Sequence, residues 1–243
     1  MSSWIKKYKD GLRRCVSPLF VSNFYNKRDI KGFIKKYEFG GKIIDFGCGN
    51  KPYQDLFSGV SDYTGIDFKK SFINSFGSPS KTPDYYFGEE YLRDFKVFFA
   101  DESFDHAVSF QVLEHHCQPE VMISELFRII KKGGYLLLSA PFLEGVHGEP
   151  NDYQRFTRFG IEERIKKYGD IIAIKEQGSI LSIISMFINE SLIRFTGISK
   201  FHYILGVIIF PPFLLFSYLA VLIDSSLKPK HFYLNYLVLA RKR

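Results

Sequence analysis

The hydrophobic pattern of the chain switches repeatedly between strand-like and helix-like periods. Short apolar runs at residues 43–46, 104–110 and 135–140 predict buried parallel strands. Before the third run, apolar residues recur at helical spacing, and the Gly133-Gly134 pair that follows them is typical of a helix end. This alternation of strands and helices predicts an α/β fold with a doubly wound, mostly parallel sheet.

The turn after the first strand predicts a nucleotide-type cofactor site. Gly47 and Gly49 stand where a sharp turn and the close approach of a ligand to the main chain require residues without a Cβ. Asp67 ends the next strand, at the position from which a carboxylate accepts hydrogen bonds from a ribose diol. A dinucleotide site requires a third glycine where this chain has Pro52. A nicotinamide cofactor is therefore our second choice, and a phosphate-free cofactor such as S-adenosylmethionine is the first.

A Leu-Glu-His sequence at residues 113–115 follows the strand at 104–110. Together with the glycine turn, the ribose acid and the later glycine pair, it makes residues 41–169 resemble the class I S-adenosylmethionine-dependent methyltransferases, within them the methyltransferase type 11-like family. The resemblance implies a Rossmann-like sheet with an antiparallel last strand, and S-adenosylmethionine as the cofactor. It also implies the cofactor-binding residues, which are Asp45, Gly47, Cys48, Gly49, Asp67, Phe68, Gln111, Val112 and Leu113.

The chain departs from this family where the adenine is held. The family often has an Asp before a Leu-Pro-Phe-like run at that place, and this chain has residues 83–100 instead. Glu89 or Asp101 is the expected replacement for the missing contact. The resemblance therefore defines the methionine and ribose ends of the site better than the adenine end.

A polar and aromatic loop, residues 147–158, follows the fifth strand, where open α/β sheets place substrates. We interpret Asp152, Tyr153 and Arg155 as substrate-binding residues, with a structural alternative in which Asp152 and Arg155 pair across a lid. His147 is a candidate general base for an acceptor hydroxyl, because its ordinary pKa lies near working pH. The structural alternative for His147 is that it holds the loop in place. The helix that follows, 158–168, is expected to be capped by the preceding threonine.

His115 is a second candidate catalytic residue, with a structural alternative, because it belongs to the family sequence whatever the acceptor is. Glu114, His115 and His116 have the side chains of a metal site. Adjacent residues on a helix do not face one another, so we predict no metal site. Methyl transfer itself asks little of side chains, because alignment of nucleophile, methyl and sulfur supplies much of the rate.

The N-terminal region carries most of the positive charge. Residues 1–42 hold eleven Lys or Arg against three Asp or Glu, a net charge of +8, while the whole chain carries +7. This basic, aromatic arm is equally compatible with binding to an anionic membrane surface, with nucleic-acid binding and with a solvated helix over the cofactor cleft, and by itself it does not decide among them. Amino-group methyltransferases of nucleic acids carry Asp or Asn before Pro-Pro-aromatic, and residues 109–112 lack that motif. No nucleic-acid partner is therefore expected.

A long apolar tract separates the last two predicted strands. Residues 201–223 contain no Asp, Glu, Lys or Arg and have the length of one membrane-spanning helix of ~20 residues. The family's sheet closes with an antiparallel hairpin, here 171–177 with 232–240, and a single span would separate its two strands. Pro211-Pro212 divides the tract into halves. We predict a broken hydrophobic hairpin that enters one leaflet and returns. The alternative is a helical pair buried against the sheet or against a second subunit in a homodimer.

These features divide the chain into a basic helical arm (1–41), a methyltransferase core (42–179), a hydrophobic insertion (180–230) and the last core strand (231–243). Three cysteines without paired spacing indicate a reducing cytoplasm, and no disulfide or zinc is expected. We therefore expect a cytoplasmic protein held peripherally or monotopically at the inner face of the membrane.

The sequence as a whole predicts an S-adenosylmethionine-dependent methyltransferase. We expect it to methylate oxygen on a small-molecule, lipid-linked, glycan or other envelope-related acceptor. One alternative is a non-catalytic module that docks at the membrane and retains the fold. The other is a nicotinamide-dependent oxidoreductase.

Overall fold

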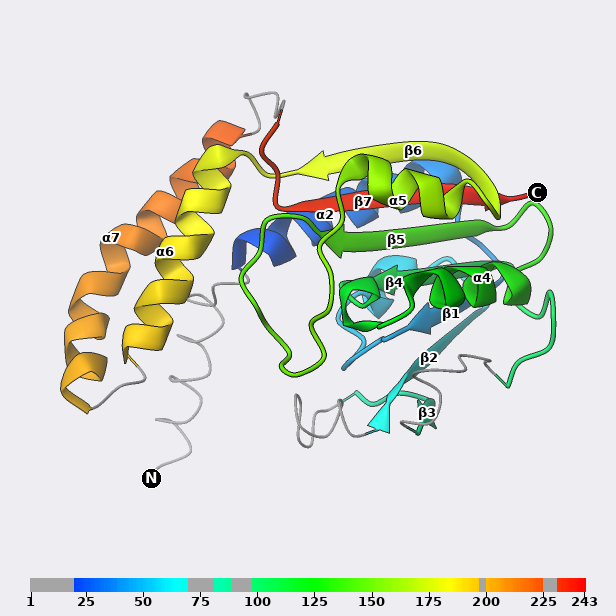
Figure 1. The fold of residues 1–243 in the computed structure, drawn as a ribbon, viewed down its shortest axis with the longest axis horizontal. Helices are drawn as coiled ribbons and strands as arrows, with labels where there is room; N and C mark the ends of the chain where they lie inside the picture. Colours follow the sequence, from blue (N-terminus) through cyan, green and yellow to red (C-terminus); the bar gives the residue numbers. More distant parts are fainter. Residues whose placement is uncertain (1–19, 70–80, 89–97, 197–199, 225–230) are drawn as a thin grey trace. The chain divides into compact units, whose positions relative to one another are not determined.

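The computed structural model describes residues 20–69, 81–88, 98–196, 200–224 and 231–243 (Figure 1). Contacts between residues divide the chain into two compact units, which we name the sheet unit and the hairpin unit. The sheet unit comprises the described residues within Lys27–Phe142, Val146–Lys175 and Tyr236–Arg243; the hairpin unit comprises those within residues 20–26, Leu143–Gly145 and Glu176–Asn235. Of the predicted basic arm, only the part from residue 20 onward is described.

The sheet unit is built on seven strands, most of them parallel. Their spatial order is β3-β2-β1-β4-β5-β7-β6. The pairs β2–β3, β1–β2, β1–β4 and β4–β5 are parallel, and β7 runs antiparallel to its neighbours (Figure 1). This topology confirms the predicted α/β, Rossmann-like fold with an antiparallel last strand. The strands are β1 (Lys42–Phe46), β2 (Asp62–Phe68), β3 (Tyr85–Phe87), β4 (His106–Phe110), β5 (Tyr135–Pro141), β6 (Gly169–Gln177) and β7 (Asn235–Lys242).

The core of the sheet unit lies between the central strands and the helix α2 (Phe20–Tyr37). Ile43 of β1, Val108 of β4 and Leu137 of β5 are fully buried and pack in one cluster with Ile30 of α2. The neighbouring residues in β1, β4 and β5, whose side chains point to the opposite face of the sheet, are buried as well, because that face is also covered. Burial on both faces explains why these strands are continuous apolar runs in the sequence.

Helices α4 (Pro119–Ile129) and α5 (Arg158–Ile165) lie in front of the sheet in Figure 1, with α2 behind it. The predicted glycine pair follows α4, and a Cβ on Gly134 would lie 2.2 Å from the carbonyl oxygen of Asp105. Only glycine fits there, because the chain passes close to the start of β4. The expected cap of α5 is present: the Thr157 hydroxyl accepts a backbone N–H from the first turn at 3.1 Å.

The hairpin unit contains α6 (Ile180–Thr196) and α7 (Lys200–Asp224), which lie side by side (Figure 1). The prediction that the prolines at 211–212 break the tract is wrong, because α7 continues through them. Beyond the prolines, the Asn189 amide of α6 donates to the Ser217 hydroxyl of α7 at 2.8 Å. Contacts with α6 therefore hold this half of α7 in helical form, although proline removes a backbone donor.

A buried carboxylate at the end of α7 organises the hairpin unit. Asp224 accepts hydrogen bonds from the Tyr25 hydroxyl at 2.7 Å and from the backbone N–H of Ser179 at 3.0 Å. The hydroxyls of Ser179 and Ser182 also donate to it. These four donors satisfy both carboxylate oxygens, so the Asp224 charge is fully compensated by hydrogen bonds.

Both helices of the hairpin unit expose apolar side chains at helical spacing. No helix in the described part of the chain combines the length and the apolar character that crossing a membrane requires. The exposed side chains, between 40% and 67% accessible, are Ile180, Ile184 and Phe187 on α6 and Leu215, Tyr218, Leu219, Leu222 and Ile223 on α7.

Candidate active site

The predicted glycine turn lies at the carboxyl end of β1, between the ends of β2 and β4. The backbone N–H groups of Gly47 and Cys48 both donate to the Ile66 carbonyl, at 2.9 and 3.1 Å. Gly47 has a φ of +71°, and a Cβ there would lie 2.3 Å from a methyl group of Val112. Glycine is thus required both by backbone conformation and by the close approach of the β4 end. The turn is followed by a short 3-10 helix, Gln54–Phe57.

Asp67 is buried at the end of β2, where the sequence places the ribose acid. Its Oδ2 accepts the Gly49 N–H at 2.6 Å and its Oδ1 accepts the Phe68 N–H at 2.6 Å. Burial raises the pKa of Asp67 to about 6, although these two hydrogen bonds oppose the rise. The carboxylate is therefore tied to the glycine turn, and each of its oxygens keeps a lone pair for a further donor.

Asp45 is the second buried carboxylate of this group. Burial raises its pKa to about 7, against the opposing effect of a 2.5 Å hydrogen bond from the Tyr63 hydroxyl; the nearby Asp67 adds to the rise. A positively charged ligand group beside Asp45 would favour its ionised form. Burial likewise raises the pKa of the neighbouring Cys48 thiol, which is consequently protonated at neutral pH.

Sequence reasoning did not single out the ion pair that braces this turn. Lys51 is buried at a φ of +55°, and its Nζ lies 2.6 Å from the Asp84 carboxylate. Asp84 also accepts the backbone N–H of Gly65 in β2, at 2.7 Å. The ion pair therefore ties the glycine turn to the chain entering β3. The only sequence signal was a lysine interrupting the small-residue pattern after Gly49.

Gln111, Val112 and Leu113 continue directly from β4. Gln111 has a φ of +57°, its backbone N–H donates to the Ser139 carbonyl at 3.1 Å, and its side-chain amide donates to the Ser139 hydroxyl at 3.2 Å. Val112 contacts the glycine turn, as described above, and Leu113 is fully buried. The structure thus brings the predicted residues from the ends of β1, β2 and β4 to one edge of the sheet.

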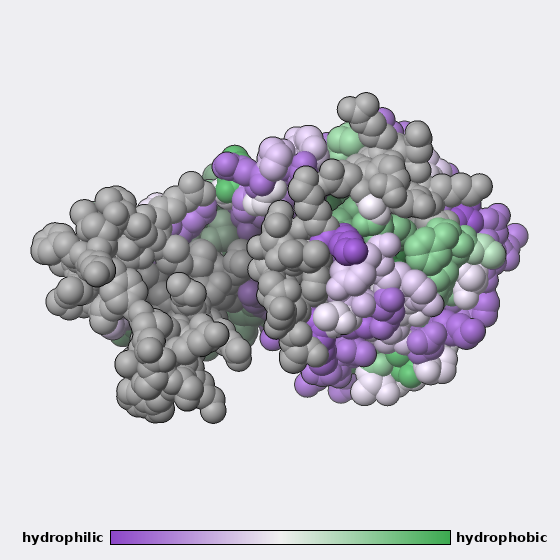
Figure 2. Space-filling model, turned by 90° about the horizontal axis from the view of Figure 1, so that it is seen from below, coloured by the Kyte–Doolittle hydropathy of each residue, from purple (hydrophilic) through white to green (hydrophobic). Residues whose placement is uncertain are grey.

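Of the two acids considered for the adenine end, Glu89 lies outside the described residues. Asp101 is exposed and pairs with Arg128. Aromatic side chains gather beside β3, where Phe98 packs against Tyr85 and Phe87 with ring centroids 5.4 and 5.6 Å apart. The view from below in Figure 2, toward the β3 side, shows a patch of hydrophobic residues bordered by hydrophilic ones.

The loop after β5 is folded around an ion pair, which confirms the pairing considered for Asp152 and Arg155. The guanidinium donates to both oxygens of Asp152, at 2.5 and 2.8 Å. Burial opposes ionisation of Asp152, but these bonds and the 2.9 Å donation from the His147 backbone N–H lower its pKa to about 2. Tyr153 is half exposed, and its backbone N–H donates to the Glu114 carbonyl at 2.9 Å, which ties the loop to the end of β4.

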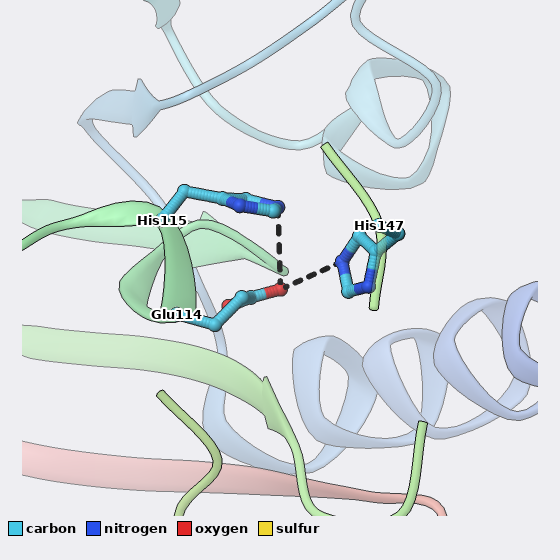
Figure 3. Close-up of side chains that lie close together, drawn as sticks. All are labelled: Glu114, His115 and His147. Carbon is cyan, nitrogen blue, oxygen red and sulfur yellow. Dashed lines mark ion pairs between the residues drawn. The ribbon is translucent and has the colours of Figure 1, made fainter. Parts of the chain in front are cut away.

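The two candidate catalytic histidines lie against one buried carboxylate. Nε2 of His115 and Nε2 of His147 lie 3.9 and 3.8 Å from the same oxygen of Glu114, Oε1 (Figure 3). Glu114 and His115 come from the 3-10 turn Leu113–His115, and His147 comes from the loop after β5. The sequence had grouped Glu114 and His115 with His116; in the structure the third member is His147.

Comparison with known proteins agrees with this arrangement of motifs. Residues 44–138 match the model of a family described as methyltransferase domain. A protein of Mycolicibacterium smegmatis named as a probable S-adenosylmethionine-dependent methyltransferase is 29% identical over 103 residues, which are 42% of this chain and 38% of that protein. An uncharacterised protein of Methanocaldococcus jannaschii is 22% identical over 135 residues, 56% of this chain and 51% of its own. The chain therefore spans about half the length, or less, of these curated relatives.

Solved structures share the fold over nearly the whole chain. The cyclase SpnF superposes with a TM-score of 0.57 at 16% identity, covering 96% of this chain and 94% of its own. A methyltransferase from Thermotoga maritima gives 0.54 at 11% identity, covering 99% and 97%. At such identities the likeness concerns the fold alone.

The sheet order, the residues at the strand ends and the domain match together define the class. The chain contains a class I methyltransferase domain, and the methyl donor of this class is S-adenosylmethionine. More particularly, its residues 44–138 carry the methyltransferase domain that the Leu-Glu-His sequence had indicated. The predicted family and cofactor are thus confirmed.

Proposed function

We propose that this chain transfers a methyl group from S-adenosylmethionine to an acceptor oxygen. The observation that carries the proposal is the pair of buried acids, Asp45 and Asp67, at adjacent strand ends around the glycine turn. Both belong to the matched methyltransferase domain, residues 44–138. Ligands of open α/β sheets bind at this carboxyl edge, where the strand order reverses between β1 and β4.

The residues present suit the groups that the cofactor carries. Asp67, already fixed by two backbone N–H groups, is proposed to accept the ribose hydroxyls. Asp45 is proposed to face the amino-acid end, whose ammonium group would offset the burial of a carboxylate. Val112, in contact with Gly47, and Leu113 are proposed to flank the bound molecule with apolar surface.

The reaction requires little more of the protein than alignment. When bound, the cofactor supplies a methyl carbon that bonds to the acceptor oxygen as its bond to sulfur breaks, with the electron pair passing to sulfur. The acceptor hydroxyl must also lose its proton, and His147 and His115 are the side chains proposed to stand nearest to that event. Asp152 and Arg155 are proposed to shape the acceptor site together with the half-exposed Tyr153.

Titration of the purified chain with S-adenosylmethionine tests the cofactor site. We expect Asp67→Ala to weaken binding by at least about 100-fold, because two hydrogen bonds to a charged group are lost. Asp62→Ala is the matched control, since Asp62 lies exposed at the other end of the same strand and should leave the affinity unchanged. Equal affinities of wild type and Asp67→Ala would reject the site assignment.

The acceptor is best sought by mass spectrometry of extracts incubated with the chain and methyl-labelled S-adenosylmethionine. We expect the label in an ether or ester of a lipid-linked, glycan or other envelope-related molecule. Label appearing on nitrogen, or only in nucleic acid, would contradict the proposed acceptor class.

The proposed acceptor class is linked to a proposed location at an anionic membrane surface. Support comes from the basic residues in the first 42 positions and from the apolar side chains exposed along α6 and α7. A helix pair of this kind binds by burying apolar side chains at the level of the lipid headgroups, without crossing the bilayer.

Flotation with phosphatidylserine-containing vesicles tests this location. We expect the triple substitution Leu215→Glu, Leu219→Glu and Leu222→Glu to reduce the bound fraction strongly, because it removes apolar side chains and places negative charge on the exposed face of α7. Phe159→Glu is the control, since Phe159 is 74% exposed but lies on α5 of the sheet unit. A wild-type chain that stays with the unbound fraction, or dimerises through α7 in sedimentation experiments, would reject the membrane assignment.

A further inference from the structure

We propose that Glu114, His115 and His147 bind one divalent transition-metal ion beside the methyl-transfer site. The three side chains offer ligand atoms that all lie within 4.8 Å of one another (Figure 3). One carboxylate and two imidazoles form a ligand set found in catalytic zinc and non-haem iron sites. What the ion would do rests on the proposed function, whereas its binding can be measured without it.

The first argument is the state of the Glu114 carboxylate. Glu114 is fully buried, and neither of its oxygens has a hydrogen-bond partner among the described residues. Burying a carboxylate without compensation is costly, so such groups are normally paired, hydrogen-bonded or bound to metal. The oxygens of Glu114 are therefore available to a cation, and Oε1 faces both imidazoles.

The second argument is the spacing of the ligand atoms. An ion held at about 2.1 Å by three tetrahedral ligands separates those ligands by about 3.4 Å. The two Nε2 atoms lie 3.9 and 3.8 Å from Glu114 Oε1, and all three ligand atoms lie within 4.8 Å of one another. Side-chain movements of up to roughly 1 Å would therefore complete the coordination. The turn that carries Glu114 and the loop that carries His147 are already joined by the 2.9 Å backbone bond from Tyr153 to Glu114.

The third argument is the orientation of the imidazole rings. Nδ1 of His115 lies 2.6 Å from the carbonyl oxygen of Asn151, which can only accept, so Nδ1 carries a hydrogen. In the neutral ring this leaves the lone pair on Nε2, the atom that faces Glu114. Metal-binding histidines are usually fixed in this way by a carbonyl or carboxylate on the other nitrogen. The Nδ1 of His147 lies 3.4 Å from the Arg155 guanidinium, which can only donate, and 3.8 Å from the Asp152 carboxylate. The hydrogen of the neutral His147 ring is therefore on Nε2 before an ion binds, and binding requires Nε2 to release it.

A simple ion pair explains the arrangement less well. If both imidazoles were protonated, each N–H would need to reach a Glu114 oxygen within about 3.2 Å to compensate its burial. The observed separations of 3.8 and 3.9 Å exceed that limit. An ion between the three groups fills the gap and interacts with all of them at once.

The position of the site indicates its use. Glu114 follows Gln111, Val112 and Leu113, which are proposed to flank the cofactor, so an ion here would lie at the acceptor side of the sheet edge. Three protein ligands leave an open coordination position for an acceptor hydroxyl. Coordination lowers the pKa of a bound hydroxyl or water by several units, so its proton can pass to solvent near neutral pH. The acceptor oxygen would then need no side chain as a base.

Calorimetric titration of the chelator-treated, dialysed chain with Zn²⁺ tests the site. We expect one ion to bind per chain, and Glu114→Gln and His147→Asn each to weaken binding by at least about 100-fold. Titration with Co²⁺ gives a second readout, because the visible absorption of the bound ion reports its coordination geometry. The absorption band of bound Co²⁺ should be missing in both variants.

Matched controls carry the same substitutions away from the site. Glu120→Gln changes a partly exposed carboxylate on α4, and His231→Asn changes an exposed histidine; both should bind Zn²⁺ as the wild type does. His147 lies on a loop and is partly exposed, so His147→Asn decides the question even if Glu114→Gln fails to fold. No saturable binding, or binding that His147→Asn leaves unchanged, would overturn the proposal.

Failure of this proposal is separable from failure of the proposed function. Zn²⁺ binding by a chain that does not bind S-adenosylmethionine would reject the methyltransferase function and leave the metal site intact. Methyl transfer at an unchanged rate by a chain that binds no metal would reject the metal site and leave the function intact.

Discussion

Two buried carboxylates, one in each unit of the molecule, have opposite surroundings. Asp224 of the hairpin unit accepts hydrogen bonds from four donors, supplied by Tyr25, Ser179 and Ser182. Glu114 of the sheet unit is more deeply buried, yet its oxygens have no hydrogen-bond partner among the described residues and face only two distant imidazole nitrogens. The Asp224 carboxylate thus has the hydrogen bonds of a structural group. The Glu114 carboxylate has oxygens that are still able to bind a cation.

The difference indicates where the chain keeps binding capacity. A satisfied carboxylate has no capacity left for a ligand, and removing it leaves its donors unpaired. An unsatisfied carboxylate destabilises the fold until something binds to it. Asp45 and Asp67 lie between these extremes, since each is buried but holds at least one protein donor.

The largest contrast is expected in the stability of two substitution variants. Asp224→Ala leaves several buried donors unpaired and should lower the free energy of unfolding by on the order of 3 kcal/mol. Glu114→Met removes a carboxylate without hydrogen bonds at similar volume, and should leave the metal-free chain within about 1 kcal/mol of wild type. Urea unfolding followed by circular dichroism measures both. Similar losses in the two variants would remove the distinction between the carboxylates.

Added Zn²⁺ should make the stability losses of the Asp224 and Glu114 variants, each relative to wild type, more alike. Zn²⁺ at a hundred times its dissociation constant should raise the free energy of unfolding of the wild-type chain by about 2.7 kcal/mol, because the ion binds only the folded state. The Glu114→Gln variant should gain at most about 0.4 kcal/mol, because its binding is expected to be at least about 100-fold weaker, while Asp224→Asn, if folded, should gain as much as wild type. Thermal unfolding with and without the ion checks this, and equal gains in Glu114→Gln would contradict the site.

Asp45 and Asp67, whose carboxylates are only partly hydrogen-bonded, should make cofactor binding depend on pH. The pKa of Asp45 is raised to about 7 and that of Asp67 to about 6, from an ordinary value of 3.8, so the folded chain retains protons that the unfolded chain has lost. Stability without cofactor should therefore fall as pH rises from about 4 to about 7.

A cationic cofactor prefers the ionised acids, so its affinity should rise at least about tenfold between pH 5 and pH 7, which is about 1.4 kcal/mol. Titrations across this range test the sign, and an affinity that falls with pH would contradict it.

The smallest effect is expected at a glycine that supports the histidine pair. Gly148 has a φ of +67°, and a Cβ there would lie 2.8 Å from Cε1 of His115. Gly148→Ala should cost about 1 kcal/mol of stability and weaken Zn²⁺ binding several-fold by displacing the ring. Gly59→Ala is the control, since a Cβ on Gly59 meets nothing within 4 Å. Wild-type Zn²⁺ affinity in Gly148→Ala would show that the ring position does not matter for binding.

Much of the fold could be predicted because its signals are local. The buried run at β1 and the Thr157 cap each depend on a few neighbouring residues, and both were predicted correctly. The prolines of α7 are also a local signal, but they misled us. Their effect was outweighed by contacts with α6, such as the bond between Asn189 and Ser217, which sequence patterns do not report.

Sequence reasoning could predict those residues of the candidate site that stand at the end of a recognisable strand. Asp45 and Asp67 each follow from their own strand. The meeting of Glu114 with His147 depends on the path of the loop after β5, which is set by Asp152, Arg155 and the backbone bond from Tyr153. Sequence reasoning also assumed a helix at residues 113–116, whereas the observed 3-10 turn brings His115 toward Glu114.

The position of β7 between β5 and β6 has a consequence for synthesis of the chain. Among the described strands, β6 pairs only with β7, which follows it in the sequence after the whole α6–α7 hairpin. At typical translation rates, residues 178–234 take about 3–11 s to appear. During that interval β6 is a strand without a neighbour while two apolar helices emerge. Chaperone capture of the nascent chain, or early engagement of the hairpin by a surface, would act most strongly in this window.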